Sequence, residues 1–264
     1  NLMSTASTPS IGDRFWRWFH SFGSPARFDR FAQSALPWFS WSAGILLFVG
    51  LGLGLFYAPP DYQQGESVRI IYVHVPAAWM SLFTYVVMAV AGGITLIWRM
   101  KLADAVARAS APLGASFTAL ALITGSLWGK PMWGTYWVWD GRLTSYLILL
   151  FLYLGYIALV NAIADRRTAS RAGAVLALVG VINLPIIHFS VEWWNTLHQG
   201  ATVTKLDAPS IDTRMLIPLL LMFFGYQMYY FAVMLLRVRN ELLDSERRSQ
   251  WIANLLLEET RSKS

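Results

Sequence analysis

Residues 109–164 read ASAPLGASFTALALITGSLWGKPMWGTYWVWDGRLTSYLILLFLYLGYIALVNAIA, which is two apolar stretches joined by an aromatic-rich connection. The stretches cover residues 109–128 and 143–164, and each reaches the ~20 helical residues needed to cross a hydrocarbon core. Because lipid cannot satisfy backbone N–H and C=O groups, each stretch is predicted to be a helix. The connection between them should then lie at a membrane surface.

The rest of the chain repeats this pattern. Four further apolar segments are found at residues 38–57, 76–98, 172–188 and 215–236. Charged residues make up 14% of the 264 residues, against about 25% in soluble domains. The sequence therefore predicts an all-α integral membrane protein whose domain, residues 38–236, is a bundle of six transmembrane helices.

The distribution of Lys and Arg predicts how the bundle is oriented. Sixteen of the 21 basic residues lie before the first span, in the second and fourth connections, or after the last span. By the positive-inside rule, both termini are expected in the cytoplasm. The connections at residues 58–75, 129–142 and 189–214 then face outward. This placement also explains the pI near 9.7 without nucleic acid as a partner.

Two flanking segments are expected to lie on the membrane surface as interfacial amphipathic helices. Residues 1–37 form a cytoplasmic N-terminal segment, in which several aromatic residues surround Arg17. Residues 237–264 form a cytoplasmic tail with apolar positions at helical spacing. For the tail, the alternative is a docking surface for a cytoplasmic partner.

Five large aromatic residues fall within residues 128–139, between the apolar stretches 109–128 and 143–164. An Asp and an Arg follow them. They are Trp128, Trp133, Tyr136, Trp137 and Trp139, followed by Asp140 and Arg142. Interfacial Trp and Tyr often act only as membrane anchors, and that role would account for some of them. A dense aromatic platform beside charged groups also suits a flat apolar ligand with anionic substituents. Heme has that chemistry.

Three histidines are predicted to face outward: His74, His188 and His198. His74 immediately precedes the second span, where Pro76 fits a first helical turn, and His188 ends the fifth span. Both imidazoles are therefore expected at similar depth near the outer boundary. Imidazole is an axial ligand of heme iron, and two can bind from opposite faces. The alternatives are that each histidine is only a polar residue at a helix end, or that His198 replaces one of the pair.

The spans lack features that other functions need. No acidic or basic residue lies at a span centre, as ion-coupled transport would require. No histidine lies in mid-span, where a transmembrane electron-transfer cytochrome would ligate heme, and the phosphate-binding G-x-x-x-x-G-K-[ST] motif is absent. The alternatives to heme handling are an electron-transfer cytochrome, or a small-molecule permease or exporter subunit without its own heme.

The motifs resemble a known family. Residues 128–144 are similar to the tryptophan-rich "WWD" signature of heme-handling proteins of cytochrome c biogenesis, and most similar to the heme exporter protein C (CcmC) family. Residues 74–79 (HVPAAW) and 184–200 (LPIIHFSVEWWNTLHQG) resemble its two outer histidine regions. The chain departs from the family pattern at Tyr136, where Trp is expected, and at Tyr146, where an acidic residue is expected.

The resemblance implies a protein of the bacterial inner membrane that binds heme b at the periplasmic face. His74 and His188 would be the axial ligands of the iron. The heme-binding surface would consist of Trp128, Trp133, Tyr136, Trp137, Trp139, Asp140 and Arg142. The implied partners are membrane lipid, a periplasmic heme chaperone, the ATPase and membrane subunits of an ABC-type exporter, and a small one-span subunit. The chain itself is expected not to be an enzyme.

Charged residues of the outer connections have alternative roles. Arg142 and Lys130 are candidates to bind the heme propionates, and Arg142 is the better bidentate donor. Arg142 could instead form an ion pair with Asp140, and Asp140 could instead cap the fourth helix through Thr144 or a neighbouring N–H group. A last group is expected either to close over the heme or to dock the chaperone: Glu192, Trp193 and Trp194.

Overall fold

The computed structural model describes residues 23–194, 211–247 and 249–253. Within these residues, six helical segments are long and apolar enough to cross a membrane, which confirms the prediction of an all-α protein with six spans. The elements are α2 (Pro25–Gly52), the π-helical turn η1 (Leu53–Tyr57), the 3₁₀ turn η2 (Glu66–Ile70), α3 (Ile71–Trp98), α4 (Lys101–Trp133), α5 (Gly141–Ala162), α6 (Arg166–Gly180), α7 (Asn183–Trp193) and α8 (Thr213–Ser245).

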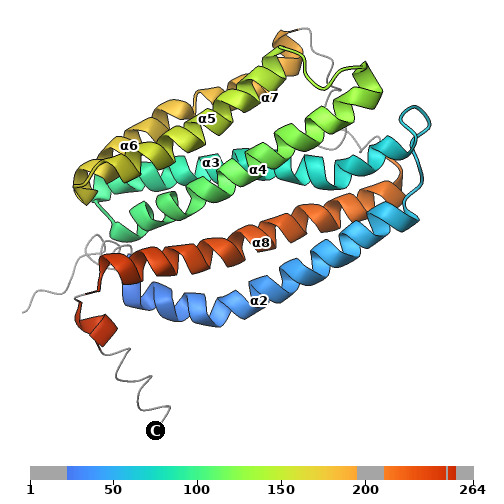
Figure 1. Cartoon of the computed structure of the whole chain (residues 1–264). Coiled ribbons are helices and arrows are strands. Elements are labelled where there is room, and N and C mark those ends of the chain that lie inside the picture. The colour runs from blue at the N-terminus through green and yellow to red at the C-terminus, as the bar shows by residue number, and fades with distance from the viewer. Residues whose placement is uncertain (1–22, 195–210, 248, 254–264) are drawn as a thin grey trace, which may run out of the picture.

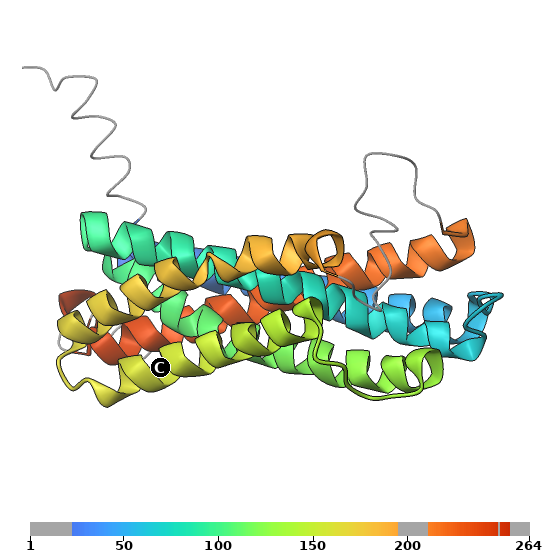
Figure 2. The ribbon, with the colours of Figure 1, turned by 90° about the horizontal axis from the view of Figure 1, so that it is seen from above.

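The helices run along one common axis in two groups. In Figure 1, α2 lies along α8 on one side of the bundle, and α3 to α7 form the other side. Figure 2 shows the same lengthwise arrangement from above. The two groups meet where α3 and α4 pack on α8, around the buried side chains of Met80, Leu113, Phe117 and Tyr230.

Several helices are longer than the apolar segments that predict them. α2 begins at Pro25, and α8 continues to Ser245, so the boundaries expected at residues 37 and 237 fall inside helices. Hydropathy marks only the part of a helix that lies in lipid, whereas helical hydrogen bonding continues into the polar layers beyond it. The aromatic cluster around Arg17 lies outside the described residues.

The fifth span, expected as one helix over residues 172–188, is discontinuous. α6 ends at Gly180 and α7 begins at Asn183. Pro185 explains the break, because it has no N–H to donate to the carbonyl four residues earlier and its ring clashes with that carbonyl. The buried side chain of Asn183 then attaches α7 to α5, since its Nδ2 donates to the backbone oxygen of Ser145 at 2.9 Å.

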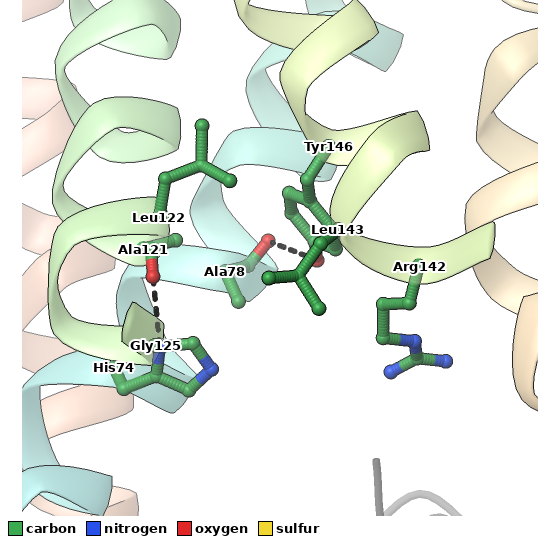
Figure 3. A pocket seen from close by; sticks show the side chains of 8 residues that line it. All are labelled: His74, Ala78, Ala121, Leu122, Gly125, Arg142, Leu143 and Tyr146. Atoms are coloured by element: carbon green, nitrogen blue, oxygen red, sulfur yellow. Dashed lines mark hydrogen bonds between the residues drawn. The ribbon is translucent and has the colours of Figure 1, made fainter. Parts of the chain in front are cut away.

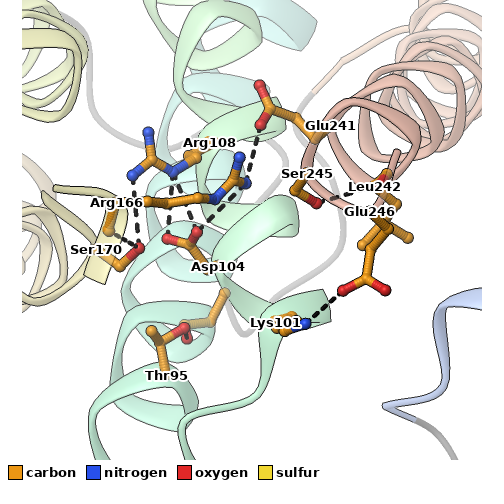
Figure 4. Close-up of polar contacts among 11 residues, drawn as sticks. Thr95, Lys101, Asp104, Arg108, Arg166, Ser170, Glu241, Leu242, Ser245 and Glu246 are labelled. Atoms are coloured by element: carbon orange, nitrogen blue, oxygen red, sulfur yellow. Dashed lines mark hydrogen bonds and ion pairs between the residues drawn. The ribbon is translucent and has the colours of Figure 1, made fainter. Parts of the chain in front are cut away.

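A group of ionic side chains joins three helices at the end of the bundle opposite the aromatic connection. This Asp104 cluster consists of Asp104 and Arg108 on α4, Arg166 on α6 and Glu241 on α8 (Figure 4). The carboxylate of Asp104 is buried and lies 3.1 Å from Nε of Arg108 and 3.6 Å from Nη2 of Arg166. Arg166 also reaches the carboxylate of Glu241 at 3.2 Å.

Candidate functional site

His74 lies inside α3 and does not precede it as expected. The 3₁₀ turn η2 leads directly into α3, so that His74 is the fourth residue of the helix and Pro76 the sixth. The prediction that Pro76 occupies the first helical turn is therefore wrong. Hydropathy did not indicate this earlier start, because the polar residues of η2 lower the hydropathy of a segment that is nevertheless helical. His74 is therefore held by a regular helix rather than by a loop.

The imidazole of His74 is held against α4. Its Nδ1 lies 3.0 Å from the backbone oxygen of Ala121 (Figure 3). The same nitrogen lies 3.1 Å from the hydroxyl of Thr124. The Thr124 hydroxyl donates to the backbone oxygen of Leu120 at 2.6 Å, so its oxygen faces Nδ1 as an acceptor. Two acceptors require a proton on Nδ1, and in the neutral ring Nε2 then carries the lone pair that a metal ion needs.

An open pocket lies on the other side of the imidazole. Its lining residues are His74, Ala78, Ala121, Leu122, Gly125, Arg142, Leu143 and Tyr146. Figure 3 shows the second nitrogen of His74 and the guanidinium of Arg142 both directed to this open side.

Arg142 connects the pocket to α7. Its Nε donates to the hydroxyl of Ser190 at 3.1 Å, and its Nη2 lies 3.4 Å from the backbone oxygen of Ile187 and 3.5 Å from that of His188. These α7 oxygens act as acceptors for the guanidinium, whose N–H groups are all donors. The guanidinium of Arg142 therefore lies between the pocket and α7.

Asp140 is the N-cap of α5. Its Oδ1 accepts a hydrogen bond from the backbone N–H of Leu143 at 2.8 Å, which satisfies one of the donors at the helix start. The cap determines where α5 begins, and Arg142 follows two residues later in the first turn of the helix. Asp140 therefore positions Arg142 through the backbone.

The aromatic residues do not form one flat surface. Trp128 and Trp133 belong to α4, which continues to Trp133 although its span was expected to end at residue 128, so the true connection is residues 134–140. Trp137 and Trp139 pack edge to face at 5.3 Å, with Trp139 the more exposed. The exposed ring of Tyr136 lies under Nζ of Lys130 at 5.2 Å.

Trp128 and Trp137 each contribute an indole N–H in a different setting. The ring of Trp128 stands edge-on to His74 with centroids 5.7 Å apart, and its Nε1 donates to the side-chain oxygen of Gln64 at 2.9 Å. The Nε1 of Trp137 is buried and has no hydrogen-bond partner among the described residues. A buried N–H donor in that state suits a ligand with acceptor oxygens.

His188 is not brought to the pocket. It is the sixth of the eleven residues of α7, it is exposed, and its ring packs edge-on to Phe189 at 4.8 Å. Its backbone oxygen contacts Arg142, but its side chain does not line the space beside His74. His198 lies outside the described residues. Of the two histidines expected as a pair, His74 lines the pocket and His188 does not.

The structure also places residues in the site that sequence reasoning missed. Tyr146 lines the pocket and donates from its hydroxyl to the backbone oxygen of Ala78 at 3.3 Å. Gly125 lies beneath the imidazole, where a Cβ atom would be 3.0 Å from Cε1 of His74. The spacing of Ala121 and Gly125 before Trp128 on one helix face was visible in the sequence, but nothing there indicated that α3 would pack on that face.

Comparison with known proteins gives consistent matches along the chain. A family model described as "Heme exporter protein C" matches residues 18–253. The protein of that name from Escherichia coli (strain K12) is 51% identical over 246 residues, which are 93% of this chain and 99% of that protein. Its counterpart from Haemophilus influenzae is 50% identical over 240 residues, covering 91% and 98%.

A third relative matches the chain to a similar extent. The heme exporter protein C of Bradyrhizobium diazoefficiens is 53% identical over 226 residues, which are 86% of each chain. The matched residues include all six spans, the pocket and the aromatic connection. This chain is therefore a multi-pass membrane protein that belongs to the heme exporter protein C family.

Proposed function

We propose that this chain is the subunit of the cytochrome c maturation system that holds heme b at the periplasmic face of the bacterial inner membrane. The observation that carries the proposal is that His74 and Arg142 line one open pocket, from α3 and α5. The first offers a neutral imidazole nitrogen for iron. The second offers a guanidinium that matches carboxylates such as the heme propionates.

The pocket residues fit one part of a heme and leave the rest accessible. His74 would bind the iron through Nε2, and Arg142 would bind a propionate near the first turn of α5. The proposed contacts beyond the pocket are those of the aromatic connection and the end of α4: Trp128, Trp133, Tyr136, Trp137 and Trp139. Burial of apolar surface contributes about 25 cal/mol per Å², so these rings can retain a porphyrin without enclosing it.

An open site suits a subunit that passes its ligand on. A heme with one exposed edge can be reached by a second protein, whereas a closed pocket would have to open first. We propose that the receiving partner is a periplasmic heme chaperone, and that an ABC-type exporter and a small one-span subunit assemble with this chain. The proposed role is that of a non-catalytic subunit, and Glu192 and the neighbouring tryptophans are candidates to contact the chaperone.

For the second axial position the chain offers His188 and His198. His188 is the sequence-based expectation, but its side chain lies outside the pocket lining on exposed α7 surface. His198 follows ten residues later in the sequence. We propose that the second ligand comes from this part of the chain, opposite a fixed His74.

The absorption spectrum of the purified protein with added heme tests this proposal. We expect a Soret band and a low-spin, six-coordinate spectrum in the wild type. His188→Ala and His198→Ala are compared in parallel, and the variant that converts the spectrum to five-coordinate identifies the second ligand. A wild-type protein that binds no heme would reject the proposed function, and two unchanged spectra would reject a ligand from this segment.

Arg142→Ala is expected to weaken heme binding by about 10- to 100-fold, because hydrogen bonds to charged groups contribute roughly 1.5–3 kcal/mol. Arg142→Lys should recover part of the affinity, since it keeps the charge and loses the bidentate geometry. Titration with heme and with its propionate dimethyl ester measures the effect. The ester should bind wild type and Arg142→Ala equally. Ser190→Ala removes the hydroxyl partner of Arg142 on α7 and keeps its two backbone partners there, so it serves as the control for indirect effects.

A further inference from the structure

One face of α4 receives the imidazole of His74. Ala121, Thr124, Gly125 and Trp128 occupy positions i, i+3, i+4 and i+7, which places them on the same side of the helix. Each of them meets the ring: a backbone oxygen at 3.0 Å, a hydroxyl at 3.1 Å, a position where a Cβ would lie 3.0 Å away, and an indole edge at 5.7 Å between centroids. We call these four residues the α4 cradle.

The polar part of the cradle determines the tautomer of His74. Ala121 supplies a carbonyl, which can only accept, and the Thr124 hydroxyl uses its hydrogen on Leu120. Both groups therefore require a proton on Nδ1. Partners of this kind on a metal-binding histidine raise the basicity of the ligating nitrogen and fix the orientation of the ring.

The apolar part of the cradle determines where the ring can lie. Gly125 allows the imidazole to approach the backbone of α4, since a larger residue would press on Cε1. Trp128 closes another side of the ring, edge-on at an interplanar angle of 74°. Trp128 does not itself line the pocket. In this geometry it contacts His74, the proposed iron ligand, and not the pocket space proposed for the porphyrin.

Gln64 fixes Trp128 from outside the membrane helices. Its side-chain oxygen accepts the hydrogen bond of the indole N–H at 2.9 Å. Its own backbone is held on both sides, because its N–H donates to Asp61 at 2.8 Å and its carbonyl accepts from the hydroxyl of Ser67 at 2.6 Å. Gln64, in the connection before α3, therefore contacts His74 indirectly, through the ring of Trp128.

We propose that Thr124, Trp128 and Gln64 are positioning residues for the iron ligand. They hold His74 in one rotamer and one tautomer, with Nε2 toward the pocket, and so set the strength and direction of the iron–imidazole bond. This inference rests on the proposed function and refines it, because it assigns Trp128 to the support of His74 and leaves the exposed rings of the connection to the porphyrin.

Paired substitutions test the inference, with heme affinity and the electron paramagnetic resonance spectrum of the ferric complex as readouts. Thr124→Val keeps the shape and removes the acceptor, and Gln64→Leu removes the partner of Trp128. Each is expected to lower heme affinity by about 10- to 100-fold, as for partners of metal-binding histidines, and to shift the low-spin signal. Thr124→Ser and Gln64→Glu keep the acceptor oxygen and should retain the wild-type heme affinity and low-spin signal.

Two controls separate positioning from general stability. Thr118→Val removes the same type of hydroxyl from the same helix, where it donates to the backbone oxygen of Gly114 at 2.7 Å and does not line the pocket, and should leave the spectrum unchanged. In a His74→Ala background, Thr124→Val should have no further effect on heme binding, because residues that act through one another are not additive. Gln64→Leu lies outside the spans, so it remains informative where Thr124→Val reduces the yield.

The outcomes distinguish this inference from the function on which it rests. If wild type binds heme, His74→Ala loses it, and Thr124→Val and Gln64→Leu keep wild-type affinity and spectra, the positioning role is rejected while the proposed function stands. If wild type binds no heme, the proposed function itself is rejected. Equal effects of Thr124→Val in the presence and absence of His74 would also reject the positioning role.

Discussion

His74→Ala should fold normally and lose the Soret band that the wild type acquires with heme. The substitution removes the nitrogen proposed for iron and leaves the aromatic contacts, which retain a porphyrin only weakly. We expect the affinity to fall by roughly 100-fold or more, which corresponds to about 2.7 kcal/mol. Heme titration in detergent, followed at the Soret maximum, measures the loss.

The fold should tolerate this change because no buried group is left without a partner. The backbone oxygen of Ala121 belongs to α4, where it retains its helical hydrogen bond, and Thr124 keeps its bond to Leu120. The unfolding midpoint of His74→Ala should therefore remain close to that of the wild type. Free imidazole should restore the spectrum by occupying the space of the missing ring. Unchanged heme affinity would show that His74 is not a ligand.

Asp104→Ala is expected to destabilise the protein by about 3–5 kcal/mol, because it leaves a buried cation without its counterion. The side chains of Asp104 and Arg108 are 9% and 11% exposed, so water cannot replace the lost partner. The same carboxylate also holds Arg166, and through it α6 and α8. The free energy of unfolding in mixed micelles, compared with the wild type, measures the effect.

Arg247→Ala is the control for an exposed ion pair. Arg247 pairs with Asp244, and the two side chains are 76% and 60% exposed, so its removal should cost about 0–1 kcal/mol. Asp104→Asn should fall between the two, since the amide keeps one acceptor and loses the charge. A similar loss in Asp104→Ala and Arg247→Ala would contradict the assignment of stability to the buried cluster.

The spans were predictable from the sequence because lipid imposes a long apolar run on any helix that crosses it. The ends of α2, α4 and α8 were not, since helices continue beyond the lipid and hydropathy does not register them. The break before α7 depends on Pro185, whose effect in a span varies with the packing around it. Its position could be anticipated, but a continuous kinked helix was an equal alternative.

The sequence allowed the residues of the candidate site to be predicted, but not which of them contact one another. The sequence pointed to His74 and Arg142, and the structure places both at one pocket. It did not indicate that His74 would meet Thr124, fifty positions away, because that contact depends on how α3 and α4 pack together. For the same reason His188 was expected beside His74, whereas the rotation of α7 leaves its side chain exposed.

The short length of α7 links ligand binding to local folding. Eleven residues are fewer than the ~12–15 that an isolated helix needs, so α7 depends on the contacts of Arg142 with it and of its own Asn183 with α5. An anion that draws the guanidinium away from the carbonyls of Ile187 and His188 therefore favours the unwound state of α7. By thermodynamic reciprocity, whatever stabilises α7 weakens the hold of Arg142 on that anion by the same free energy.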